Sequence, residues 1–249
     1  NEEKQISEAL NSVLHQTYSH FELLVFTDGC TDQTASIVKK MAEKDSRIVC
    51  IESKENVGKG FGRNTLMKQA RGEYLAIFDA DDYMYSERLE KQVAFFLENP
   101  DIAVLGTQLE YIHHKTKASI ITSFPLNHSS IWSSPFKGIP IANPAAMIRK
   151  EVFGPCEFKL NLPYAQDYDF WFQSNNQGFK FANLNEVLVK YTWNPTPPWR
   201  SIKYQLKVKF YWLFKGKFSP FKSLFDIFSF LASVAYNHLK FWLKKSPKQ

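Results

Sequence analysis

The sequence has 249 residues, of which 44% are hydrophobic and 22% charged, values that are ordinary for a globular protein with a sizeable core. Its three cysteines stand at unrelated spacings, which argues against a disulfide framework or a zinc site and fits a reducing compartment. The net charge of +6 is uneven, because residues 200–249 carry +10 and the remainder therefore carries −4. Such an asymmetry suggests that the C-terminal part has a partner.

The first part of the chain alternates helical and strand patterns. Apolar residues recur at helical spacing in three stretches and form short continuous runs between them. The predicted elements are a helix at 4–15, a strand at 21–26, a helix at 35–44, a strand at 48–51 and a helix at 63–70. A loop with three glycines, at residues 56–62, precedes the last of these helices. Strands joined by helices through short links are typical of βαβ units, so we expect a parallel sheet.

The next strand is predicted where the apolar run 74–78 ends in three carboxylates, Asp79, Asp81 and Asp82. Carboxylates at the end of such a strand lie where open α/β sheets bind their ligands. Like charges this close raise one another's pKa, and a divalent cation is the simplest partner because carboxylate oxygens suit Mg²⁺ or Mn²⁺. The alternative is an acidic turn that caps the following helix, with Asp82 as the N-cap.

The second part of the chain is less regular. Its predicted elements are a helix at 88–97, strands at 103–105 and 109–112, a strand at 145–148, a helix at 166–177 and a strand at 186–193. Between residues 113 and 140 we expect loops and one short edge strand. The proline-rich stretch 194–198 breaks regular structure and predicts a boundary between a domain of residues 1–195 and a tail of residues 196–249.

The tail is rich in Phe, Trp and Leu interleaved with Lys, and its apolar residues recur at helical spacing. Its longest charge-free run, residues 227–239, is too short to span a bilayer comfortably. A basic, aromatic amphipathic helix suits an anionic membrane surface, so we expect peripheral membrane contact through residues 200–245. The alternative is that this face packs on the first domain or on a second subunit. Nucleic acid is not expected as a partner, because no recognition motif accompanies the basic residues.

Five motifs, in order, resemble those of the family 2 glycosyltransferases. They are residues 12–18 with 21–25, the acidic loop 28–32, residues 58–64 with 70–74, the carboxylates of 79–82 and the acidic stretch 166–171. The resemblance covers residues 4–193 and is far more specific than any single motif. It implies a GT-A type α/β fold, with a Rossmann-like, mostly parallel sheet flanked by helices and here a C-terminal helical tail. It also implies an enzyme that moves a sugar from a nucleoside-diphosphate sugar to an acceptor hydroxyl with inversion.

The resemblance assigns roles to individual residues. It implies that Asp81 binds the divalent metal, Mn²⁺ or Mg²⁺, and that Asp167 is the catalytic general base. The residues expected to bind the nucleotide-sugar are Asp28, Arg63, Asp79 and Ala80, and those expected on the acceptor side are Asn143 and Tyr164. For Asp167 the alternative is a helix-cap carboxylate paired with a nearby lysine, and for Arg63 it is a surface arginine.

Three departures from the family pattern accompany this resemblance. The family's first strand, before the opening helix, is not in the sequence, so either the chain is a fragment or the sheet lacks a strand. Thr27 replaces an expected aspartate and Gln166 an expected glutamate. These departures motivate an alternative, a non-catalytic nucleotide-sugar-binding or scaffold protein.

The expected partners are a nucleotide-sugar, with a UDP-sugar favoured, and a glycan or lipid-linked acceptor in surface polysaccharide or glycolipid synthesis. The expected location is cytoplasmic, on the inner face of the cell membrane.

Overall fold

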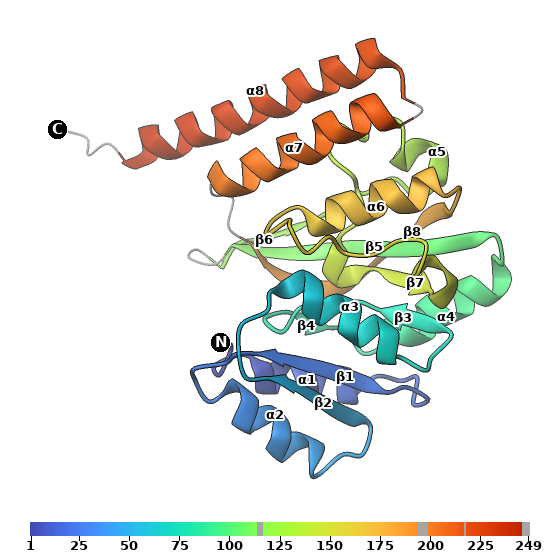
Figure 1. The fold of residues 1–249 in the computed structure, drawn as a ribbon, viewed down its shortest axis with the longest axis vertical. Helices are drawn as coiled ribbons and strands as arrows, with labels where there is room; N and C mark the ends of the chain where they lie inside the picture. Colours follow the sequence, from blue (N-terminus) through green and yellow to red (C-terminus); the bar gives the residue numbers. More distant parts are fainter. Residues whose placement is uncertain (114–116, 194–198, 217, 246–249) are drawn as a thin grey trace.

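The computed structural model describes residues 1–113, 117–193, 199–216 and 218–245 (Figure 1). The elements form layers: a two-stranded sheet with α2 lies at one end, a larger sheet lies in the middle, and helices α6, α7 and α8 stack on the far side of that sheet (Figure 1). The predicted boundary stretch at residues 194–198 lies outside the described residues.

The N-terminal layer follows the predicted alternation of helices and strands. Its elements are α1 (Ile6–Leu14), β1 (Leu23–Asp28), α2 (Thr34–Ala42), β2 (Ile48–Ser53) and α3 (Lys59–Gln69). Strands β1 and β2 pair in parallel along their whole length, as expected for a βαβ unit. The apolar faces of α1 and α2 meet over this sheet through Ile6, Leu10 and Val38, which are all at most 4% exposed. The periodic pattern therefore predicted this layer correctly.

The larger sheet has the strand order β3-β7-β5-β8-β4, with β6 paired to β5. Its strands are β3 (Tyr74–Ala76), β4 (Tyr83–Met84), β5 (Ile102–His113), β6 (Ser119–Ile121), β7 (Met147–Arg149) and β8 (Lys180–Trp193). The α/β class is confirmed, but the sheets are not mostly parallel as expected. Only the pairs β1–β2 and β5–β8 are parallel. The other pairs are antiparallel. Each antiparallel pair includes a strand of only two or three residues.

The long strand β5 replaces the two short strands predicted at 103–105 and 109–112. The sequence between them, Gly106-Thr107-Gln108, resembles a break because it is small and polar, yet Gln108 is only 3% exposed. Its side chain donates to the Phe124 carbonyl (3.0 Å) and accepts from the Phe124 amide (2.7 Å). A buried amide that is hydrogen-bonded in this way can remain inside a strand.

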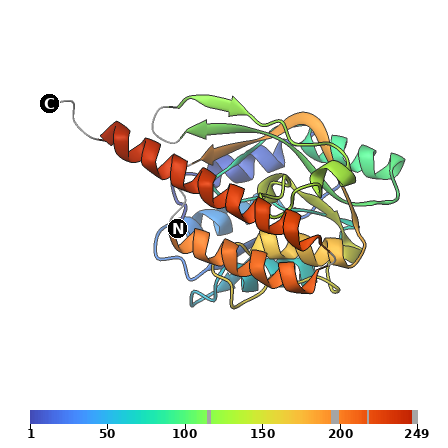
Figure 2. The same cartoon turned by 90° about the horizontal axis from the view of Figure 1, so that it is seen from above.

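The tail forms two helices, α7 (Trp199–Lys215) and α8 (Pro220–Lys245), rather than the single helix that the periodicity predicted. Proline at the first position of α8 is favourable because its missing N–H needs no partner there. Helix α7 lies between α6 (Gln166–Asn176) and α8 (Figure 1), and from above α8 crosses the molecule diagonally beside α7 (Figure 2). Buried side chains of α6, α7 and α8 share one apolar cluster. Among the described residues, no helix is both long and apolar enough to cross a bilayer.

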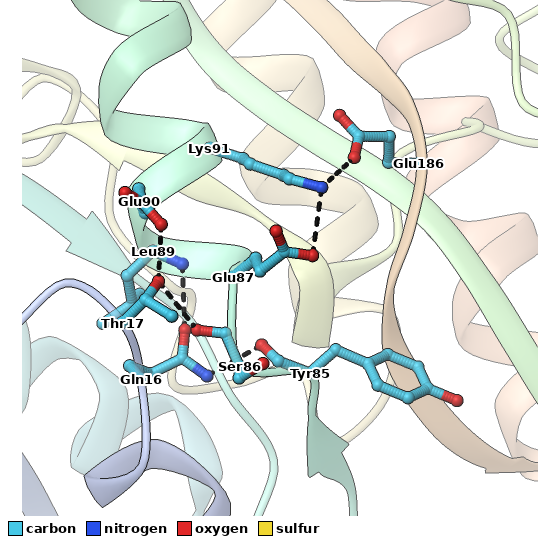
Figure 3. A network of polar contacts seen from close by, with 9 residues as sticks. All are labelled: Gln16, Thr17, Tyr85, Ser86, Glu87, Leu89, Glu90, Lys91 and Glu186. Carbon is cyan, nitrogen blue, oxygen red and sulfur yellow. Dashed lines mark hydrogen bonds and ion pairs between the residues drawn. The ribbon is translucent and has the colours of Figure 1, made fainter.

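A polar network fixes the loop that follows the three clustered carboxylates (Figure 3). The Gln16 side chain, after α1, donates to the Tyr85 carbonyl (2.8 Å) and accepts from the Leu89 amide (3.0 Å). On the other side of this loop, Lys91 of α4 (Arg88–Glu98) pairs with Glu87 and with Glu186 of β8. Helix α1, the loop and β8 are thereby held together behind the acidic motif.

Candidate active site

A cavity of about 510 Å³ lies between the starts of α3 and α6 and the strands β5 and β8. This volume is in the range of small-molecule sites. Its polar walls are formed by Lys59, Arg63, Asp79, Tyr111, Asn143, Tyr164, Gln166, Asp167 and Tyr191. Five of the predicted site residues therefore line one cavity: Arg63, Asp79, Asn143, Tyr164 and Asp167. The other three, Asp28, Ala80 and Asp81, are not part of its lining.

The acidic motif places Asp79 in the cavity wall. The Arg63 guanidinium lies 3.3 Å from the Asp79 carboxylate and 5.2 Å from the centre of the Phe158 ring, and its side chain is only 20% exposed. Arg63 is therefore held in the wall by an ion pair and a cation–π contact, and the alternative of a free surface arginine is wrong. Lys59 lies one turn before Arg63 on α3 and adds a second positive group. Sequence reasoning missed Lys59 because it stands inside the glycine-rich stretch.

The negative charge of the three carboxylates in the motif is only partly balanced by nearby positive groups. Burial together with the Asp79 charge raises the pKa of Asp81 above its ordinary value. Asp82 is 5% exposed, and burial with the charges of Asp79 and Asp81 raises its pKa to about 8. The alternative that Asp82 caps the next helix is wrong, because α4 begins at Arg88 with Glu87 as its N-cap. A bound cation would relieve this repulsion.

The donor set of this motif fits a magnesium or manganese ion that is shared with a substrate. No group of three acidic, histidine or cysteine side chains in the described chain could enclose a metal. Asp81, alone or together with Asp79, offers one or two carboxylates. Mg²⁺ is commonly bound by one or two carboxylates together with substrate phosphates and water. A bound cation would lower the pKa of Asp81 and relieve its repulsion with Asp79.

Asp167 lies in the first turn of α6 and faces the cavity. Its carboxylate accepts only one hydrogen bond in the described structure, from the Tyr168 amide (2.9 Å). The N-cap of α6 is Ala165, and the nearby Lys159 pairs with Asp169 instead (3.0 Å). The alternative reading of Asp167 as a lysine-paired cap is therefore wrong, and its free oxygen is available to a ligand.

Asp28 has a structural role at the end of β1. Its carboxylate accepts hydrogen bonds from the amides of Val57 (2.6 Å) and Gly58 (3.0 Å), directly before α3. The neighbouring Gly29 has φ +57°, and a Cβ there would lie 2.5 Å from the Asn56 nitrogen. This close approach requires glycine and holds the start of α3 beside the strand end. A contact of Asp28 with the nucleotide stays a prediction.

Asn143 is buried in the cavity wall without internal partners. It is 5% exposed, and neither its side-chain nitrogen nor its side-chain oxygen has a hydrogen-bond partner among the described residues. An unpaired buried amide costs about 1–3 kcal/mol. Both atoms lie beneath the cavity surface, so a ligand hydroxyl would reach them only after a small movement of the wall. Tyr164 stands at the rim, 37% exposed, with its ring 6.0 Å from that of Tyr204 in α7.

Arg88 supports the site from behind, a role that the sequence analysis did not predict. It is fully buried and donates to three backbone carbonyls, those of Ile77 (2.9 Å), Pro144 (2.8 Å) and Ala146 (3.1 Å). Ile77 precedes the acidic motif and Pro144 follows Asn143. One buried guanidinium therefore fixes two walls of the cavity relative to each other.

A family model and individual relatives both match this chain to glycosyltransferases. The family described as Glycosyl transferase family 2 matches residues 1–154. An uncharacterized glycosyltransferase of Methanocaldococcus jannaschii, MJ1057, is 32% identical over 76% of this chain, and the match spans 66% of that relative's length.

Solved structures agree on the fold. S. aureus TarS 1–349 in complex with UDP superposes with a TM-score of 0.71 at 23% identity, over 93% of this chain and 68% of the other. The mannosyltransferase PcManGT of Pyrobaculum calidifontis, in complex with GDP-Man and Mn²⁺, gives 0.68 at 19% identity, over 96% of this chain and 72% of the other.

Proposed function

Because the chain belongs to glycosyl transferase family 2, we propose that it transfers a sugar from a nucleoside-diphosphate sugar to an acceptor hydroxyl with inversion at the anomeric carbon. The observation that carries this proposal is the shared cavity, in which the Arg63–Asp79 pair faces the Asp167 carboxylate across a space of ligand size. TarS with UDP and PcManGT with GDP-Man support a nucleotide-sugar donor, and we favour a UDP-sugar.

The donor diphosphate would bind at the end of the acidic motif. Asp81, with Asp79, would hold Mn²⁺ or Mg²⁺, which when bound neutralises charge on the leaving diphosphate. Lys59 and Arg63 supply positive charge from α3 to the same region. Asp79, Ala80 and Asp28 would complete the nucleotide contacts, with Asp28 also fixing the loop before α3.

Asp167 would remove the proton from the attacking acceptor hydroxyl. Its carboxylate faces the cavity without an ion pair in the described chain, so it can accept a proton when an acceptor lies within hydrogen-bond reach. Holding that hydroxyl in line with the donor supplies a further part of the rate enhancement. Asn143 and Tyr164 would contact the acceptor, since the unpaired Asn143 amide suits a hydroxyl of a glycan.

The metal role is tested by calorimetry with UDP. We expect UDP to bind the wild-type protein at least about tenfold more tightly with Mn²⁺ than without it, a gain of about 1.4 kcal/mol. Asp81→Asn should lose this metal-dependent gain because it removes one anionic ligand. A matched control is Asp101→Asn, which removes an exposed carboxylate paired with Lys180. Equal UDP affinity with and without Mn²⁺ in the wild type would contradict the role of Asp81.

The same calorimetry, followed by a donor hydrolysis assay, separates the two candidate functions. Binding of UDP together with turnover of a donor sugar supports the transferase. Binding without any donor hydrolysis or transfer supports a non-catalytic nucleotide-sugar-binding or scaffold protein, the alternative that Thr27 and Gln166 motivate. Absence of UDP binding contradicts both.

We propose that residues 1–195 form the catalytic domain and that the tail, residues 196–249, places it on the inner face of the cell membrane. Large aromatic side chains on the outer side of α7 and α8 are exposed: Phe214 (85%), Phe221 (88%), Phe225 (72%) and Phe228 (69%). Lys222 is exposed among them, and Asp226, the single acid of the tail, is buried. A basic, aromatic face of this kind suits an anionic surface, and a lipid-linked or polysaccharide acceptor would be available there.

Membrane contact is tested by flotation with lipid vesicles. We expect the protein to float with vesicles that contain phosphatidylglycerol and not with vesicles of phosphatidylcholine alone, because the tail carries +10. Replacing Phe225 and Phe228 with serine should reduce flotation, since it removes exposed apolar area. Leu97 of α4, which is 70% exposed and far from the tail in sequence, provides the control Leu97→Ser. Flotation that is equal for all three proteins would contradict the assignment.

A further inference from the structure

The first turn of α6, which carries Asp167, lacks the usual helix-start contacts. Its N-cap Ala165 makes no side-chain cap hydrogen bond and adopts a left-handed backbone conformation, with φ 59°. Non-glycine residues in this conformation cost of order 1–3 kcal/mol and persist only when the surrounding structure holds them. Another part of the molecule must therefore fix this turn.

Helix α7 supplies one of these contacts through Trp212. The indole nitrogen donates to the Asp169 carboxylate (2.8 Å), which also accepts from Lys159 (3.0 Å) and Gln173 (2.7 Å). Asp169 is 1% exposed and Trp212 is 3% exposed. The indole ring also stacks on Phe172 of α6, with ring centres 5.6 Å apart. A charge-assisted hydrogen bond in a buried setting is strong and directional.

Helix α7 supplies a second contact through Lys209. This lysine is fully buried and donates to the Tyr168 hydroxyl (2.8 Å) and to the Phe136 carbonyl. Its ammonium lies 4.6 Å from the centre of the Tyr168 ring and 4.2 Å from that of Phe230 in α8. Burial lowers the pKa of Lys209 to about 7, and the Asp226 carboxylate opposes this effect. Burying an ammonium group costs free energy, so the hydrogen bonds and ring contacts of Lys209 must offset that cost.

The two residues that follow Asp167 in α6 are thus both held by α7. Tyr168 is bound by Lys209 and donates to the Pro135 carbonyl, and Asp169 is bound by Trp212. Within the described residues the Asp167 carboxylate makes no hydrogen bond to Lys209 or Trp212, and it lines the cavity. Neighbouring residues of one helical turn cannot move independently, so the orientation of the Asp167 carboxylate depends on α7.

We propose that Lys209 and Trp212 of the tail are positioning residues for Asp167, so that the tail is part of the catalytic apparatus as well as a surface-binding element. This inference rests on the proposed function of Asp167 as the general base. A displacement of about 1 Å at a catalytic group can lower a rate by about 10²-fold. Loosening α7 should therefore act on the transfer step and leave nucleotide binding unchanged.

The principal test uses Trp212→Phe, which keeps an aromatic ring on Phe172 and removes the indole N–H. We expect kcat for transfer to fall by about 10- to 100-fold with the KM for the donor and the affinity for UDP unchanged. Phe210→Leu alters an aromatic side chain at a position of α7 that is 43% exposed and should leave kcat unchanged. Lys209→Met, with Lys207→Met on the exposed side of the helix as its control, repeats the comparison at the second contact.

Two further measurements separate positioning from a general loss of structure. In the Asp167→Asn background, Trp212→Phe should cause no additional loss of kcat, because residues that act through one another are not additive. Hydrogen exchange of the amides of residues 166–170 should be faster in Trp212→Phe than in Phe210→Leu, and this readout needs no transfer assay.

Three outcomes overturn the inference: a kcat equal to that of the wild type, an equal loss in the Asp167→Asn background, or unchanged exchange at residues 166–170. A wild-type protein that neither binds nor turns over a donor would overturn the proposed function instead. Hydrogen exchange would still decide whether α7 holds the first turn of α6.

Discussion

Replacing Asp167 with asparagine is expected to lower the rate of sugar transfer by about 10²- to 10⁴-fold while UDP affinity and thermal stability stay unchanged. The asparagine amide has the same shape and keeps an oxygen for the Tyr168 amide, but it cannot take up a proton from the acceptor. No ion pair and no cap bond of α6 in the described structure depends on this carboxylate. Steady-state kinetics with a saturating donor would measure the effect on kcat.

The control for this variant is Asp101→Asn, which changes an exposed carboxylate at the far end of β5. It should keep wild-type kinetics. Wild-type kcat in Asp167→Asn would exclude Asp167 as the base. The other carboxylate in the same turn, Asp169, is 1% exposed and hydrogen-bonded to Lys159, Gln173 and Trp212, so it is not free to replace Asp167 as the base.

Replacing Arg88 with methionine should lower the free energy of unfolding by about 3–5 kcal/mol, because three buried carbonyls would lose their charged donor. The partner one turn later, Gln92, also loses a hydrogen bond (3.0 Å) and is itself fully buried. The cavity walls around Ile77 and Pro144 should become more mobile in the Arg88→Met variant. Urea denaturation followed by circular dichroism would measure the change.

Arg71→Met is the matched control for Arg88→Met. Arg71 pairs with Glu22 at the surface, with its own side chain 82% exposed, so its loss should cost less than about 1 kcal/mol. If the two variants were equally stable, the carbonyls at the cavity would not depend on Arg88.

The helices and strands of the N-terminal layer were predictable because each buries one periodic face. The loop predicted at 56–62 is confirmed only for residues 56–58, since α3 begins at Lys59 and contains Gly60 and Gly62. A Cβ at Gly62 would lie 2.8 Å from the Phe26 ring, and one at Gly60 would lie 2.7 Å from the Gln166 amide. These glycines permit α3 to approach β1 and α6 closely, a role that sequence alone does not distinguish from loop flexibility.

The candidate site was predictable only where residue type and position were both informative. The carboxylates of Asp79 and Asp167 follow or begin regular elements within motifs of the family, and both line the cavity. Arg88 and Lys209 were missed because their partners are mainly backbone carbonyls or a tyrosine hydroxyl distant in sequence. Such contacts leave no periodic pattern. A charged residue in an otherwise apolar helix face was the available signal.

The pairing of β5 with β8 has a consequence for how the chain reaches its native state. Ile102 pairs with Lys180, and the register continues to His113 with Trp193, so the central ladder joins segments roughly 80 residues apart. The chain must close that loop before any of these pairs form, whereas β1 and β2 meet across a single short helix. Folding should therefore start in the N-terminal layer and be limited in rate by assembly of the central sheet. The cavity, whose floor is built on that ladder, would be among the last parts to form.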